Sequence, residues 1–272
     1  MERRFLLEQV DDAAVVQYYA DGFNSLPLDQ KILIWHLYQA ALAGRDIYYD
    51  QRYRYSLEMR GLLEEIVTHP DAVHPAVLTE IGRYLKIFWM NSGPHNNLTA
   101  RKFVLRCTPE ELRAAAHTAV RPRMSFVESG NPAGSESTTP EVLTLDEKLN
   151  RLQGAFFDPA ADAMITQKTP VDGRDILSAS ANNLYADVTM ADLAAFSERY
   201  GLNSRLVRQN GGLVEETYRL GGPYGELIAR VVRHLQAGLP YAPPATRRAL
   251  EAHIPFYQTG EDADRVRYDV PW

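Results

Sequence analysis

The sequence predicts an α+β fold that is mainly helical, with a small, largely antiparallel β-core. Three observations indicate this class: apolar residues recur at helical spacing in the first third, an Asn-Gly-Gly turn separates two alternating runs in the last third, and helical periods follow that turn. The 272 residues are 45% hydrophobic and 24% charged, with a net charge of −6. This is the composition of an ordinary globular protein.

The N-terminal part is predicted to be a layer of three helices. Apolar residues recur at helical spacing over 28–43, 46–68 and 75–90. Gly44 is expected to end the first helix, and the second is expected to stop before Pro70, because a residue that precedes proline is pushed out of the helical region. We therefore expect a single lobe over 1–272, in which 1–107 form a helical layer and 108–272 form a mixed α/β portion.

The mixed portion carries clear helix start signals. Thr108 and Thr144 each stand three residues before a glutamate, which is the pattern of a capping box. Thr189 is expected to cap a helix that ends at Gly201. Between these helices, 125–139 are expected to form a surface loop.

Strands are expected in two places. The run 175–180 is predicted to be a strand that ends at two asparagines. A hairpin is predicted over 204–218, because Asn210-Gly211 lies between two alternating runs and both residues of such a turn need a positive φ. Helices are then expected over 223–236 and 244–257.

Composition disfavours several classes of function. The acidic balance argues against a nucleic-acid-binding protein, and no apolar run approaches the roughly 18 residues needed to span a bilayer. The first residues lack the apolar stretch of a secretory signal, and the single cysteine, Cys107, cannot form an internal disulfide. A cytoplasmic location is therefore expected. We interpret Cys107 as a small buried hydrophobe rather than a nucleophile, because it follows an apolar run.

The seven histidines do not form a metal-binding pattern. None precedes a glutamate and no two lie four residues apart, so no helix presents the usual zinc-binding pair. His69 and His74, five residues apart, are interpreted as helix-end cations in preference to metal ligands. We therefore assign no catalytic residue, no metal ligand and no cofactor to this chain.

Two polar clusters are candidates for a binding site. Residues 91–97 follow an aromatic-rich helix end and form either a recognition loop or an ordinary helix exit. Small side chains over 178–185 leave room for another backbone, so this run either captures a peptide by strand addition or packs as an interior strand. The candidate substrate-binding residues are Ser178, Ser180, Asn182, Asn183, Tyr185, His95 and Asn96.

Six segments share their order and spacing with one known family. They are 37–47, 86–95, 178–189, 201–207, 213–225 and 256–260, and the match extends from about residue 30 to the end. Together they resemble the N-terminal half of the dipeptidyl-peptidase III family of zinc metallopeptidases, its bacterial branch in particular. The resemblance implies the substrate-side lobe of a two-lobed exopeptidase that releases dipeptides from the N-termini of short peptides, with helices around a small β-core that forms one wall of a cleft.

In that family a His-Glu-x-x-Gly-His helix and a further glutamate hold the zinc, downstream of the region matched here. The resemblance thus implies zinc in another lobe. The expected partners are short peptides and that lobe, or a second copy through an apolar face with Phe256, Tyr257, Tyr268 and Trp272 as candidates. The alternative is a stand-alone, truncated homologue that binds a peptide or a partner protein, or catalyses an unrelated reaction in the old cleft. A reading frame that continues past Trp272 into the zinc motif would favour the first interpretation.

Overall fold

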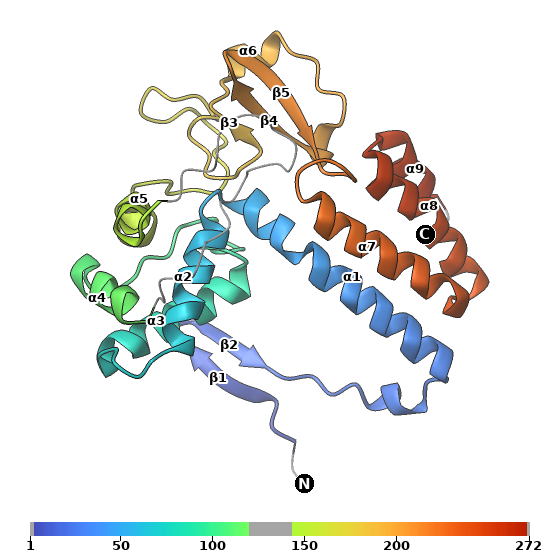
Figure 1. Ribbon diagram of the computed structural model, residues 1–272, viewed down its shortest axis with the longest axis horizontal. Coiled ribbons are helices and arrows are strands. Elements are labelled where there is room, and N and C mark those ends of the chain that lie inside the picture. Colours follow the sequence, from blue (N-terminus) through green and yellow to red (C-terminus); the bar gives the residue numbers. More distant parts are fainter. Residues whose placement is uncertain (1–2, 120–142, 271–272) are drawn as a thin grey trace. The chain divides into compact units, whose positions relative to one another are not determined.

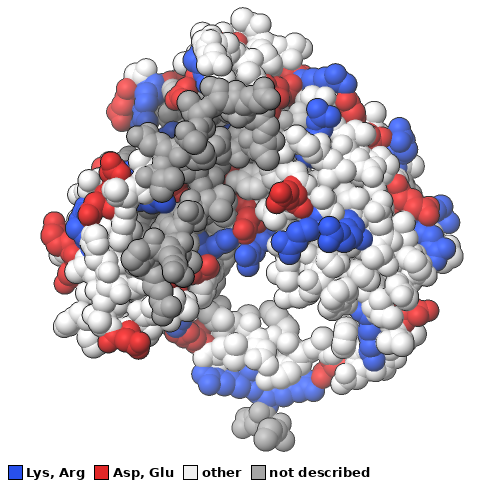
Figure 2. All heavy atoms as spheres, in the orientation of Figure 1, with Lys and Arg blue, Asp and Glu red and all other residues white. Residues whose placement is uncertain are grey.

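The part of the chain that the structure describes consists of helices and two small sheets, which confirms the α+β prediction (Figure 1). The computed structural model describes residues 3–119 and 143–270. The loop expected over 125–139 and the terminal Trp272 lie outside these residues. No helix in the described part of the chain combines the length and apolarity needed to cross a bilayer. On the face drawn in Figure 2, acidic and basic side chains are interspersed.

The described residues divide into two compact units. The first contains 3–18, 49–119 and 143–183, and the second contains 19–48 and 184–270. Each unit therefore takes residues from both sides of the expected boundary at 107/108. Helix α1 (Leu28–Arg52) contributes its last turn to the first unit and the rest of its length to the second.

The first unit is a hairpin beside a group of helices. Its elements are β1 (Leu6–Val10), β2 (Ala13–Val16), the end of α1, α2 (Ser56–Thr68), α3 (Pro75–Asn91), α4 (Pro109–Ala119) and α5 (Leu145–Phe157). Its core lies among the helices and includes the fully buried side chains of Met59, Leu63, Ile81, Phe88, Leu112, Leu152 and Phe156. The β1–β2 hairpin was not predicted from the sequence; its turn places Asp11 at φ 53°.

The second unit packs three helices together and carries a three-stranded sheet. Its elements are η1 (Asp21–Ser25), α1, β3 (Tyr185–Ala186), α6 (Met190–Ala194), η2 (Gly201–Asn203), β4 (Ser204–Gln209), β5 (Gly212–Thr217), α7 (Gly225–Gly238), η3 (Leu239–Tyr241), α8 (Pro244–Thr259) and α9 (Asp262–Asp269). The strand order is β3-β4-β5, with β3 parallel to β4 and β4 antiparallel to β5. Figure 1 shows α1, α7 and α8 side by side, and their apolar faces form the second core.

Structural features that depend on residues close together in sequence were predicted correctly. The capping boxes of Thr108 and Thr144 are present, each with the hydroxyl accepting from the amide three residues on. The β4–β5 hairpin turns at Asn210 and Gly211, with φ values of 49° and 81°. Helix α2 ends at Thr68, two residues before the proline.

Three helix boundaries were predicted wrongly. The helix expected over 46–68 begins at Ser56, because 46–52 continue α1. Helix α1 runs through Gly44 to Arg52, because a single glycine inside a helical pattern lowers helix stability without ending the helix. The helix expected to reach Gly201 ends at Ala194. Beyond it, the amides of Arg199 and Tyr200 donate to the Glu215 carboxylate instead of continuing the helix.

Candidate functional site

The run 175–180 is a series of turns, so the predicted strand is wrong. Asp175 Oδ1 accepts hydrogen bonds from the amides of Leu177 and Ser178 at 3.0 and 2.9 Å, and its carbonyl accepts from the amide of Ala179. An aspartate that satisfies the amides two and three residues on stabilises a turn at the expense of a strand. Strand addition along 178–180 therefore lacks the extended backbone that it requires.

The two serines of this run bond within it. Ser178 is exposed, and its Oγ lies 3.0 Å from Asp175 Oδ1. Ser180 Oγ donates to the Ile176 carbonyl at 2.6 Å and accepts from the Gln167 amide at 2.9 Å. Both hydroxyls hold the turns in place.

The two asparagines connect the run 175–183 to other segments of the first unit, including the last turn of α1. The main-chain amides of Asn182 and Asn183 donate to the carbonyls of Ile165 and Gln51 at 3.0 and 2.9 Å. Asn182 Nδ2 also donates to the Ile165 carbonyl. Asn183 is buried, and its Nδ2 donates to Asp50 Oδ1 at 3.1 Å. These amide groups are engaged inside the fold.

His95 and Asn96 belong to the exit of α3. Ser92 adopts the left-handed conformation that ends the helix, and Asn96 Oδ1 accepts from the amides of Leu98 and Thr99. His95 is 1% exposed, and its Nε2 donates to the Asp162 carbonyl at 2.8 Å. Residues 91–97 were interpreted as either a recognition loop or an ordinary helix exit, and these contacts are those of a helix exit.

A buried polar cluster surrounds His95. The hydroxyl of Tyr53 donates to Asp162 Oδ2 at 2.8 Å, the Tyr53 ring packs edge-on against His95, and Lys102 Nζ donates to the carbonyls of Gly154 and Ala161. Burial is the first cause of three shifts: it lowers the pKa of His95, lowers that of Lys102 and raises that of Tyr53. These residues are far apart in sequence, so no sequence spacing indicated that they would form a cluster. Their hydrogen bonds connect separate segments of the first unit.

Tyr185 is the candidate whose main chain lies at a sheet edge. Leu206 N donates to the Leu184 carbonyl, so in this parallel ladder the polar groups of residues 184 and 186 face β4. The N–H and C=O of Tyr185 then point to the opposite side of β3. In the described part of the chain no strand pairs with that side.

The Tyr185 side chain reaches a carboxylate. Its hydroxyl donates to Glu198 Oε1 at 3.2 Å. Burial, and then the Glu198 carboxylate, raise the pKa of the Tyr185 phenol. Among the described residues no cation forms an ion pair with Glu198, whereas Arg199 beside it pairs with Glu261. No sequence pattern marks Glu198, since a single glutamate before an arginine is common.

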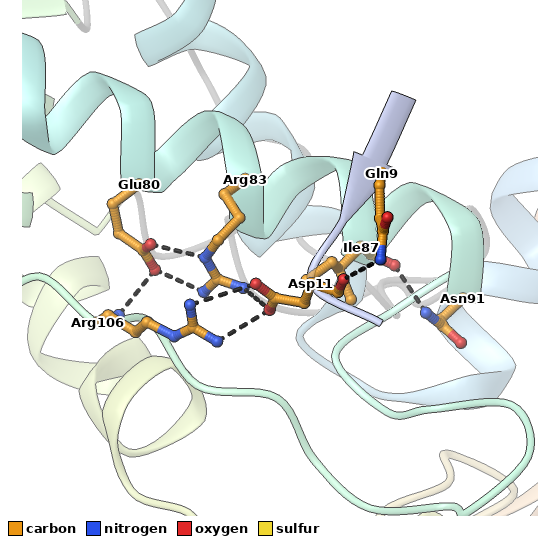
Figure 3. Close-up of polar contacts among 7 residues, drawn as sticks. All are labelled: Gln9, Asp11, Glu80, Arg83, Ile87, Asn91 and Arg106. Carbon is orange, nitrogen blue, oxygen red and sulfur yellow. Dashed lines mark hydrogen bonds and ion pairs between the residues drawn. The ribbon is translucent and has the colours of Figure 1, made fainter. Parts of the chain in front are cut away.

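A second polar cluster attaches the β1–β2 hairpin to α3 (Figure 3). Asp11 lies between the guanidinium groups of Arg83 and Arg106, at 2.7 and 2.9 Å, and Arg83 also binds Glu80 at 2.6 Å. Beside it is a hollow of about 450 Å³ between hairpin and helix. Two carboxylates balance two guanidinium groups, so this cluster is an ionic cross-link rather than an anion site.

Zinc has no suitable ligand set in the described residues. No three His, Cys, Asp or Glu side chains among them are grouped so that they could hold a metal ion. Burial raises the pKa of Cys107 to about 11, so its thiolate is scarce at neutral pH. The aromatic residues expected on an apolar face, Phe256, Tyr257 and Tyr268, are half-buried around the His253 ring.

The comparisons with known proteins give a similar fold among solved structures. No family model and no curated protein matches the chain. Among solved structures, DPP III from Caldithrix abyssi is similar with a TM-score of 0.54 and 16% sequence identity. The match covers 92% of this chain and 34% of that one, so the chain spans about a third of the length of its structural neighbour. The resemblance expected from the sequence is therefore confirmed at the level of the fold: this chain is built like one part of a DPP III.

Proposed function

We propose that this chain is the peptide-binding part of a DPP III-like exopeptidase that releases dipeptides from the N-termini of short peptides. The observation that supports this is the fold likeness, which takes in nearly all of this chain and only a third of DPP III from Caldithrix abyssi. The described residues do not fit a zinc ion. We therefore place metal-assisted water activation in a lobe outside these residues, and peptide capture within them.

The peptide pairs with the open edge of β3 through its main chain. Tyr185 offers one N–H and one C=O on that edge, which is enough for a two-bond contact with one peptide residue. Main-chain pairing gives affinity with little dependence on side chains. This suits an enzyme that acts on short peptides of varied sequence.

The Glu198 carboxylate binds the α-ammonium group of the peptide. It lies next to the Tyr185 hydroxyl and is half-buried, so the attraction is less screened than it would be in bulk water. An exopeptidase that releases dipeptides from N-termini must recognise a free α-ammonium group, and a carboxylate beside the pairing edge provides this recognition.

An NMR titration with a tetrapeptide tests the pairing. We expect amide shifts at residues 184–186 and weak affinity, because the other wall of the cleft is absent. Tyr185→Pro removes the N–H on the open edge while leaving the bonds to β4, and we expect it to weaken binding about tenfold, the effect of losing about 1.4 kcal/mol. Tyr185→Phe keeps the N–H and is the matched control. Equal binding by the Pro variant and the wild type would refute the pairing.

The anchoring of the N-terminus has a separate test. The wild type should bind the free tetrapeptide more tightly than its N-acetylated form, and Glu198→Gln should abolish that difference. The matched control is Glu226→Gln, an exposed carboxylate on α7. Separately, the zinc-supplemented chain should not release dipeptides from a dipeptidyl-naphthylamide; robust release would show that the assignment of the chemistry to another lobe is wrong.

A further inference from the structure

Two histidines meet ring to ring inside the second unit, and neither the resemblance nor the proposed function uses them. His36 on α1 and His234 on α7 are half-buried, with their Nδ1 atoms 3.3 Å apart and their ring centroids 5.6 Å apart. The two helices approach closely here: a Cβ on Gly238 would lie 3.3 Å from Leu33 and 3.4 Å from His36. The contact is thus fixed by the packing of two helices.

Aromatic and cationic groups surround the pair. The Tyr241 ring of η3 stacks on His36, and the Trp35 ring lies edge-on to both imidazoles, at centroid distances of 4.8 Å from His36 and 5.6 Å from His234. The charged groups that act on His234 are the guanidinium groups of Arg230 and Arg233 on α7. Among the described residues, no Asp, Glu or Cys side chain completes a metal-binding group with the two histidines.

The short contact limits how many protons the pair can hold. A neutral imidazole has one N–H and one lone pair, so one Nδ1 donates to the other. A first added proton converts the donor ring to imidazolium and strengthens this bond, because hydrogen bonds from a charged donor are stronger. A second added proton places two Nδ1–H groups head to head and two positive charges side by side, which the contact cannot accommodate.

We propose that the His36–His234 contact is a proton-sensitive lock between α1 and α7, closed while at most one of the two rings is charged and opened by the second proton. Burial, then His36, and then Arg233 and Arg230 lower the pKa of His234. This direction agrees with a contact that opposes the binding of a second proton. A depressed folded-state pKa means that the unfolded chain binds the proton more readily. The lock therefore stabilises the unit above the ordinary histidine pKa of about 6.5 and is lost as pH falls below it.

Ring NMR of the whole, unmodified chain is the first test. Long-range ¹⁵N–¹H correlations at neutral pH should show one Nδ1 protonated and the other as an acceptor. On acidification the pair should titrate in two coupled steps rather than as two independent rings. Two rings with both Nδ1 atoms unprotonated at neutral pH would overturn the proposal without any variant.

A substitution tests the coupling directly. In His36→Asn the pKa of His234 should shift upward, whereas His253→Asn, which changes a histidine packed on Tyr268 elsewhere in the same unit, should leave it unchanged. Trp35 emission supplies a second readout: it should change with pH in the wild type, and this change should disappear in Trp35→Phe. An identical His234 titration in the wild type and in His36→Asn would show that the rings do not interact.

Discussion

At the scale of single residues, Gly260 and Gly211 show two different reasons why a position requires glycine: a positive φ, and the lack of space for a side chain. Both have a positive φ, 76° and 81°. A Cβ on Gly260 would lie 2.5 Å from Thr217 Cγ2, whereas a Cβ on Gly211 would meet nothing within 4 Å. Gly211→Ala should therefore cost about 1–2 kcal/mol of backbone strain. Gly260→Ala should cost about 1–3 kcal/mol more, because Thr217 must also move. Urea unfolding measures both, and equal losses would contradict the packing argument.

A buried side-chain bond gives the second residue-scale prediction. Asn183 Nδ2 donates to the nearly inaccessible Asp50 carboxylate. Asn183→Ala removes a hydrogen-bond donor from a buried carboxyl group, so we expect the free energy of unfolding to fall by about 1–3 kcal/mol. The control is Ser178→Ala, whose hydroxyl is exposed and should matter by less than about 0.5 kcal/mol. Comparable losses for the two variants would exclude a buried bond at Asn183.

At the scale of elements, two helix glycines face neighbours at different distances. A Cβ on Gly44 of α1 would make an ordinary 3.8 Å contact with Val231, but one on Gly238 of α7 would press against Leu33 at 3.3 Å. Gly44→Ala should stabilise the protein by up to about 1 kcal/mol, since alanine is the better helix former. Gly238→Ala should be neutral or destabilising. Thermal melts rank the two variants, and the reverse order would contradict the distances.

Elements that depend on adjacent residues were predictable from the sequence, and those that depend on distant partners were not. The β4–β5 hairpin follows from Asn210-Gly211, because the turn itself requires those residues. The chain beyond α6 does not stay helical, and there the amides of Arg199 and Tyr200 donate to Glu215, 16 and 15 positions further on. Likewise, Asn183 appeared to be a binding residue because Asp50, which occupies its amide, lies 133 positions away. Of the candidate site residues, Tyr185 lies on a strand edge that no other strand in the described part of the chain pairs with.

At the scale of the whole molecule, exposed apolar side chains on α1 predict self-association. Ile34, Trp35, Tyr38 and Leu42 are 41–58% exposed and follow one face of the helix. Light scattering and sedimentation at high concentration should detect dimers or larger species. Leu42→Glu should raise the dissociation constant about tenfold or more. Val266→Glu, an equally exposed apolar position on α9, should leave it unchanged. A strictly monomeric wild type would contradict this prediction.

Helix α1 also determines how the protein should lose its structure. It is one continuous hydrogen-bonded rod of 25 residues, about 37 Å long, and the division between the two units falls within it at residues 48 and 49. Melting it takes Leu33, Ala40 and Ala43 from the second core and Tyr49 from the first, so both cores lose buried side chains when this helix melts. We expect one cooperative transition, in which Trp35 in one unit and Trp89 in the other change fluorescence at the same urea concentration.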